Sequence, residues 1–395
     1  MAKLHFDVRD IFRVIRLGWS GKKIWIGLIG LIVAYAGYSI LVSIGHLVSG
    51  TTLSALWHRY GLFPGALIGE LTLLGTLIHV LGMLFVLAVV FLASCMICKI
   101  TYQQLRGDDF YSSGDAWRFL KSNWTGVLFG PIAVLAMFVF FVVVGAIIGW
   151  LVGVIPWAGE LAFALFFIPI FFAALIAIFI AIVFVVALMM SPAIVGTVGE
   201  DTLEVIIQSF SLTWSQPWRL LFYSLWMNVS VLIGVSILGG FMGATLWLIS
   251  WACGLFMGQK LANMLVVAHR YIPCPWNWDT ITCNLPAAGM PSGTEMWAGR
   301  ILAVMLLLLM GVLMSYGISA KASGFSLIYV ILRKRKDDEN LLEWEDETLD
   351  EDAPAVAEPE KQEESEASEA TEETGEGAKE DDSGETSEPK SDGGN

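Results

Sequence analysis

Long uninterrupted apolar segments alternate with short polar connections along residues 1–336. Six of these segments are long enough to cross the bilayer core, about 30 Å thick, which takes about 20 helical residues. They run over Ile24–Val48, Leu71–Cys98, Val127–Leu151, Leu161–Met190, Leu220–Ser250 and Ile301–Ile331. Lipid tolerates only helices or closed barrels, and these segments lack the alternation of barrel strands. The pattern predicts an all-α fold, a polytopic transmembrane helix bundle with six spans.

One region leaves seven spans as an alternative. Leu220–Ile272 is mostly apolar and has Gly239–Gly240 near its middle, which is enough chain for two spans joined by a tight turn. A seventh span would place Arg333–Lys336 outside, against the tendency of basic residues to stay in the cytoplasm. We therefore expect six spans, with residues 252–270 as an amphipathic helix on the outer surface.

Amphipathic segments precede two of the spans. Near the N-terminus, five apolar residues share one side of a predicted helix: Val8, Ile11, Phe12, Ile15 and Trp19. The other side carries Arg9, Arg13 and Arg16, an arrangement suited to the anionic inner leaflet. This helix is interpreted either as an orienting anchor or as a specific lipid site.

A second amphipathic helix is expected after Asp201, whose side chain can cap it with Glu204 three residues on. Its apolar residues recur at helical spacing: Leu203, Ile206, Ile207, Phe210 and Trp214. We expect this helix to lie flat on the cytoplasmic face.

The net charge divides the chain into two regions, 1–336 and 337–395. The full chain carries −14, and residues 337–395 hold 25 acidic residues and three lysines, so residues 1–336 carry +8. Basic residues cluster before the first span, in the second connection and after the sixth span, which predicts that both termini are cytoplasmic.

The acidic region 337–395 is expected to be a disordered cytoplasmic tail, because it has too few apolar residues to bury a core. Leu341, Leu342 and Trp344 are the exception. Apolar side chains in acidic surroundings are typical of a motif that docks on a protein partner.

Two pairs of cysteines allow more than one interpretation. Cys274 and Cys283 flank a loop expected outside the membrane, where disulfides persist, so they form either a disulfide or two free thiols. Cys95 and Cys98 have CxxC spacing without a thioredoxin-like context or a second ligand pair. They are interpreted as helix-packing residues.

Few polar side chains interrupt the spans. His79, Asn228 and Lys321 are the candidates for an intramembrane polar site, since ionisable groups in lipid are costly and often mark a pathway. Lys321 is interpreted either as a partner of His79 or as a residue that reaches the headgroups. Gly311, Ser315, Ser319 and Ser323 form a small-residue stripe, expected to pack within the bundle or in a dimer.

The sequence predicts no enzyme and no resident cofactor or metal. It contains no nucleotide-binding glycine loop, no HExxH and no nucleophile elbow, and its five histidines form no pair at ligand spacing. We expect membrane lipids as partners, a protein partner at the cytoplasmic face or tail, and no nucleic acid.

The run MMSPAIVGTVGEDTLEVIIQSFSLTWSQPWRLLFYSLW resembles the membrane domain of some bacterial glycerophosphoryl diester phosphodiesterases and its stand-alone relatives. The matching positions are Pro192, Glu200, Ser209, Leu212 and Trp218, whereas Val205 or Ile206 stands where alanine is usual. The sequence shows no second domain the size of the soluble phosphodiesterase barrel. The resemblance therefore implies a multi-helix bacterial inner-membrane domain and no catalytic residue.

Two functional classes follow. The first, which we favour, is a non-catalytic inner-membrane protein that organises lipid or protein partners through its cytoplasmic surface helices and tail. The alternative is a transporter or channel for a small or lipidic solute, which would use His79, Asn228 and Lys321.

Overall fold

The computed structural model describes residues 8–61, 65, 71–199, 201–271, 281–337 and 341–343, which are helical and contain no strand. Six helices are long and apolar enough to cross a membrane. They are α3 (Gly21–Val48), α5 (Leu73–Arg106), α6 (Ser113–Val154), α8 (Phe167–Val198), α10 (Pro217–Met257) and α13 (Gly293–Asp337). The chain is a multi-pass membrane protein, and the predicted all-α bundle with six spans is confirmed.

Shorter helices connect and flank the spans. They are α1 (Val8–Ile11), α2 (Val14–Gly18), α4 (Leu53–Tyr60), α7 (Ala158–Leu165), α9 (Thr202–Ser215) and α11 (Gln259–His269). A single 3₁₀ turn, η1 (Leu341–Glu343), follows α13.

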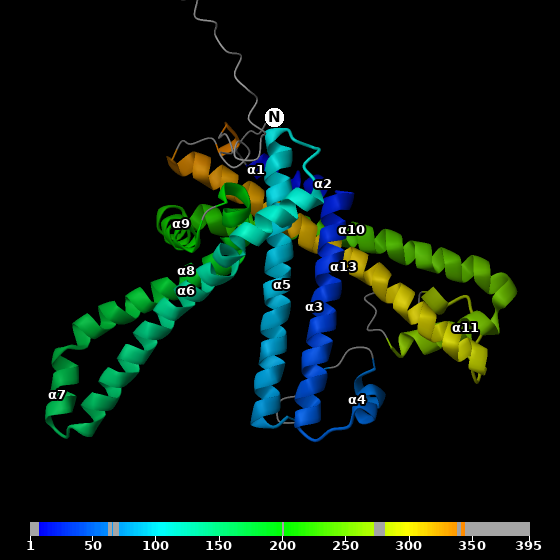
Figure 1. The fold of residues 1–395 in the computed structure, drawn as a ribbon, viewed down its shortest axis with the longest axis horizontal. Helices are drawn as coiled ribbons and strands as arrows, with labels where there is room; N and C mark the ends of the chain where they lie inside the picture. The colour runs from blue at the N-terminus through cyan, green and yellow to red at the C-terminus, as the bar shows by residue number, and fades with distance from the viewer. Residues whose placement is uncertain are drawn as a thin grey trace, which may run out of the picture. The chain divides into compact units, whose positions relative to one another are not determined.

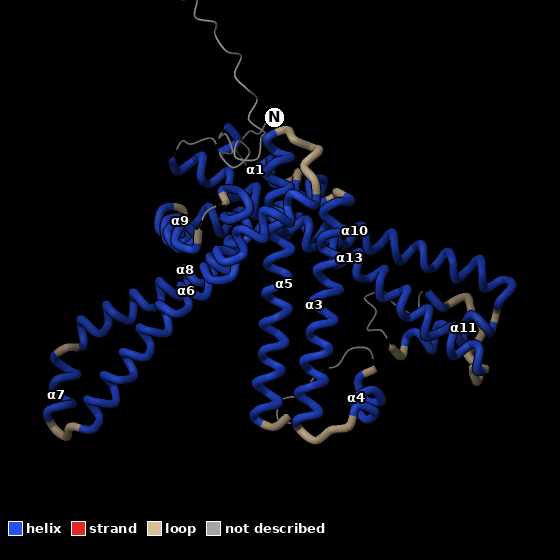
Figure 2. The backbone as a smooth tube through the Cα atoms, in the orientation of Figure 1, coloured by secondary structure: helices blue, strands red, loops and turns tan. Residues whose placement is uncertain are grey.

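The spans form three pairs of neighbouring helices: α3 with α5, α6 with α8, and α10 with α13 (Figure 1). The three pairs meet at one end, next to α1, α2 and α9, and we call this end the junction. Figure 2 shows that the spans remain helical as they enter it. Buried side chains concentrate here, including residues 93–105 of α5 and 187–197 of α8. Away from the junction, most large apolar side chains of α6 and α10 are exposed, as expected for surfaces that face lipid.

The small-residue stripe of α13 packs against α2 and α3. The Ser319 hydroxyl donates to the Gly18 carbonyl oxygen at 2.9 Å, and the Ser315 hydroxyl donates to the Ile24 carbonyl oxygen. A Cβ added to Gly18 would lie 2.6 Å from the Cα of Ala320, so only glycine allows this approach. The stripe therefore serves packing within the bundle.

A buried lysine completes the junction. Lys23 is fully buried at the start of α3, where its ammonium donates to the Leu17 carbonyl oxygen at 3.0 Å and to Gln104 Oε1 at 2.9 Å. Ser323 Oγ lies 3.5 Å from the same nitrogen and 2.9 Å from the Thr101 hydroxyl. A buried charge is tolerated only when polar partners replace its water. Lys23 therefore joins α3, α5 and α13.

The seven-span alternative is wrong. Helix α10 is continuous through Gly239–Gly240 and ends at Met257, where Gly258 adopts a φ of +47°. The chain then forms α11, whose 11 residues are too few to cross a bilayer and which packs against α13. The predicted outer helix over 252–270 is thus shorter, because α10 extends beyond Ser250 and Gly258 makes the turn.

Two local predictions also need correction. The N-terminal amphipathic segment forms two short helices, because the Arg13 amide bonds to the Asp10 carbonyl oxygen in a turn between them. Helix α9 does begin after Asp201, but that side chain makes no capping hydrogen bond. Glu204 instead lies 3.7 Å from Arg333 of α13 and accepts from Gln208.

Replacing Gly18 with alanine tests the close contact between α2 and α13. The added methyl group would overlap the backbone of Ala320, and overpacking of this kind typically costs about 1–3 kcal/mol. We expect a lower midpoint of thermal unfolding for the protein purified in detergent. Gly21→Ala is the matched control, because nothing lies within 4 Å of a Cβ at that position. Equal midpoints for the two variants would contradict this packing.

Candidate functional site

The predicted lipid-contacting arginines lie on the surface of the junction. Arg9, Arg13 and Arg16 are exposed, while Ile11 and Val14 between them are fully buried in the core. Arg13 lies 3.5 Å from the carboxylate of Asp10. The arginines thus have the orientation that a contact with headgroups requires, and that contact stays a prediction.

The three intramembrane polar residues are not brought together. Among the described residues, no hydrogen bond or ring contact joins His79, Asn228 and Lys321: the His79 ring stacks edge-on against Tyr38, and Asn228 donates to a carbonyl of its own helix. Lys321 and Ser94 of α5 line the same cavity, and His79 is 15 residues, or about 22 Å, further along α5 than Ser94. A pair between Lys321 and His79 is therefore out of reach.

The two remaining predicted features lie partly outside the described residues. Cys283 is exposed, but Cys274 lies outside the described residues, so the choice between a disulfide and two free thiols stays open. Leu341 and Leu342 are buried in the junction, and the Tyr102 hydroxyl donates to the Leu341 carbonyl oxygen at 2.5 Å. These two leucines pack on the protein itself and are not free for a partner. Trp344 lies outside the described residues.

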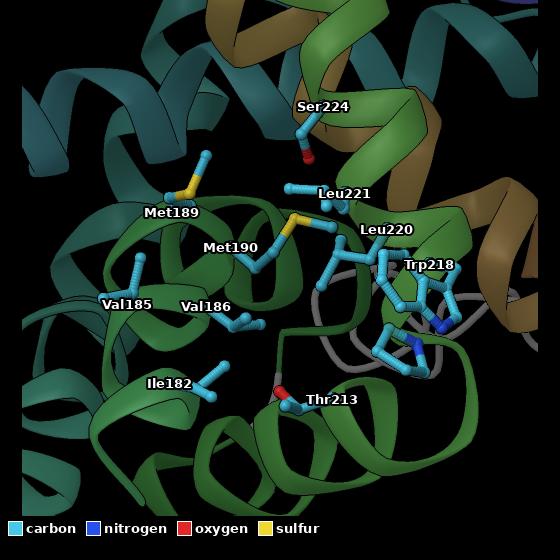
Figure 3. A pocket seen from close by; sticks show the side chains of 11 residues that line it. Ile182, Val185, Val186, Met189, Met190, Thr213, Trp218, Leu220, Leu221 and Ser224 are labelled. Carbon is cyan, nitrogen blue, oxygen red and sulfur yellow. The ribbon is translucent and has the colours of Figure 1, made fainter. Parts of the chain in front are cut away.

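An apolar groove lies beside the junction, between α8, the end of α9 and the start of α10 (Figure 3). We call it the α8–α10 groove. Its volume is about 420 Å³, within the usual range of sites for small ligands. Its lining residues are Ile182, Val185, Val186, Met189, Met190, Thr213, Pro217, Trp218, Leu220, Leu221 and Ser224.

Local sequence explains how these three helices form a groove. Helix α8 ends at Gly199, which adopts the left-handed conformation with a φ of +79° and lets the chain turn into α9. Helix α9 ends at Gln216, and Pro217 starts α10 at a position where its missing N–H costs no hydrogen bond. The two turns hold α9 across the gap between α8 and α10.

Helix α9 places its serine and glutamine face toward the protein. Val205, Ser209 and Leu212 are fully buried, whereas Leu203 and Trp214 are 71% and 79% exposed. Leu203, Ile207 and Trp214 thus point outward, as expected for an interfacial helix whose environment is lipid. Ile206 and Phe210, from the same predicted apolar set, are instead half-buried against residues of α6 and α8. The contact between Glu204 and Arg333 fastens this helix to the end of α13.

The chemistry of the α8–α10 groove is that of an apolar binding surface. No ionisable side chain is among its lining residues, and the Thr213 hydroxyl already donates to the Ser209 carbonyl oxygen at 2.7 Å. Such a surface offers no titratable acid or base to a reaction, and its side-chain hydroxyls are those of Thr213 and Ser224. Its methionines suit a flexible apolar ligand, because their unbranched side chains adapt to irregular shapes.

No metal site is found in the described part of the chain, where no three His, Cys, Asp or Glu side chains gather at ligand distance. Comparisons with models of protein families, with curated proteins and with solved structures find no match. The resemblance to the membrane domain of glycerophosphoryl diester phosphodiesterases therefore stays a prediction.

Sequence reasoning missed both the groove and the role of Lys23. Groove residues such as Val185 and Met189 have the same composition as residues that face lipid, so no local pattern distinguishes them. For Lys23 a signal was present, because two adjacent lysines at the start of a span point about 100° apart around the helix and so meet different surroundings. Lys22 is exposed and Lys23 is buried.

Glu204→Gln tests the attachment of α9. Loss of the charge weakens the contact with Arg333, and because the two side chains are only 26% and 13% exposed, we expect a cost of about 1 kcal/mol. Amide hydrogen exchange within α9 should become about fivefold faster. Asp201→Asn is the control, because Asp201 makes no side-chain cap and asparagine is an equally good N-cap. Equal acceleration in both variants would contradict the role of Glu204.

Proposed function

We propose that this chain is a non-catalytic protein of a bacterial inner membrane that organises lipid at its cytoplasmic side. The observation that carries the proposal is the α8–α10 groove, an apolar cavity of about 420 Å³ beside an interfacial helix. An acyl chain is the ligand that an apolar groove without ionisable side chains accommodates best in a membrane. Trp218 and the exposed Trp214 suit the level of the headgroups, where tryptophan is enriched.

The distribution of charge supports a cytoplasmic junction. Basic residues gather at this end of the spans: Arg9, Arg13, Arg16, Lys22, Arg106, Arg118, Lys121 and Arg333–Lys336. The connections at the other ends carry Arg59, Lys260, Arg270 and Arg300. Because lysine and arginine are retained inside, this asymmetry favours cytoplasmic N- and C-terminal ends for the membrane domain.

The alternative of a transporter or channel has less support. A polar pathway needs polar groups that follow one another through the bilayer, whereas His79 lies about 22 Å along α5 from Ser94, which lines the same cavity as Lys321 of α13. Asn228 is exposed on α10 and bonds to its own helix. Lipid organisation requires no such pathway.

A photoreactive phospholipid with a diazirine in its acyl chain tests lipid binding in the groove. In nanodiscs, we expect it to label peptides of α8 and α10 that line the groove. Leu221→Trp fills the space and should lower this labelling several-fold. Leu225→Trp is the matched control, because Leu225 is as exposed as Leu221, at 62% against 61%, but lies outside the groove. Unchanged labelling in Leu221→Trp would refute the groove as a lipid site.

Cysteine labelling tests the orientation. In a cysteine-free background, a thiol at Asp109, next to Lys22 in the junction, should react with a membrane-impermeant maleimide only after the cells are opened. A thiol at Ser292, before α13, should react in intact cells. The opposite pattern would place the junction outside and contradict the proposed localisation.

A further inference from the structure

A second cavity lies between α5, α8 and α13. Its volume is about 280 Å³, and Met189 lines both cavities. Most of its wall is apolar, with Leu87, Val90 and Phe91 contributed by α5. Along α5 the lining runs from Leu87 to Cys98, a rise of about 16 Å. This is close to half of the hydrocarbon thickness, about 30 Å, and so to the depth of one leaflet.

One charged side chain faces this cavity. Lys321 is exposed and lines the wall, and among the described residues none forms a hydrogen bond or ion pair with it. Its neighbour Ser323 points the other way, toward Lys23 and Thr101. The hydrogen-bond acceptors around Ser323 therefore bind the ammonium of Lys23. The ammonium of Lys321 remains available to a ligand. No carboxylate is among the lining residues.

The contacts of α13 set the depth of this ammonium. Ser319 bonds to Gly18, which precedes α3, and Ser323 lies beside Lys23 in its first turn. Lys321 lies between these two residues on α13 and hence at the level where α3 enters the membrane. An ammonium at this level reaches the phosphates of the adjacent leaflet, while the apolar wall below it faces the acyl chains.

We propose that the cavity between α5, α8 and α13 binds one anionic phospholipid, its phosphate at Lys321 and an acyl chain along Leu87, Val90 and Phe91. This proposal rests on the proposed function, which it extends from acyl chains in general to recognition of a headgroup. The site takes its charge selectivity from Lys321 and its depth from the contacts of α13.

The test uses the full chain in nanodiscs with acyl-diazirine phosphatidylglycerol, and the labelled peptides are mapped by mass spectrometry. We expect labelling of α5 around Leu87–Phe91. Lys321→Met should lower it about fivefold, the factor that corresponds to about 1 kcal/mol for one interfacial lysine. Lys321→Arg should retain it, because the charge is kept. Lys121→Met is the control, since Lys121 is equally exposed but does not line the cavity.

Two comparisons keep the test independent of any folding defect in the variants. On the unmodified protein, acyl-diazirine phosphatidylcholine should label α5 several-fold less than phosphatidylglycerol does; equal labelling would overturn the proposal. A diazirine fatty acid that labels α5 with the same dependence on Lys321 and displaces phosphatidylglycerol would also overturn it, because the ligand would then be a free carboxylate.

Labelling of the α8–α10 groove alone would overturn this site and leave the proposed function intact. The absence of labelling at both places would refute both.

Discussion

The close approach of α13 to α2 and α3 is the contact on which the rest of the membrane domain depends. Gly18 and Gly27 on one side meet Ala320 and Ser315 on the other at distances that leave no room for a Cβ. Lipid provides no hydrophobic force between helices, so association relies on van der Waals contact and hydrogen bonds, which small residues make possible. The serine hydroxyls of α13 add bonds to backbone carbonyls at the same contact.

Because of this contact, Lys23 and Lys321 lie in different surroundings. With α13 held against α3, Ser323 approaches Lys23, and Gln104 and Leu17 supply the other acceptors of that buried ammonium. Lys321, on a different face of α13 from Ser323, lines a cavity between α5, α8 and α13. The first lysine stabilises the junction, and the second is available to a ligand at the level of the headgroups.

The two cavities follow from how the pairs of spans meet. The pairs contact one another through the buried residues of α5, α8 and α13, which concentrate at the junction. Apolar space therefore opens in two places along α8 next to the junction, with Met189 in both linings. In a membrane such space fills with acyl chains, which is why the proposed function concerns lipid.

The sequence by itself determined the six spans, the start of α9 at Asp201 and the basic character of the junction. These features depend on composition and on local periodicity, and a segment of about 20 apolar residues needs no tertiary contact to be identified. The sequence left open whether Gly239–Gly240 makes a turn, because glycine is tolerated in a transmembrane helix when neighbouring helices support it.

Only the tertiary structure decided which polar residues meet. In the sequence, each of His79, Asn228 and Lys321 is a polar residue within an apolar segment. The depth of each residue in the membrane and its neighbours depend on the axial position of its helix relative to the helices that pack against it. The same holds for Leu341 and Leu342, which the sequence presents as exposed and the fold buries beside Tyr102. Cavities depend on three helices at once, and local periodicity carries no information on how the third helix packs.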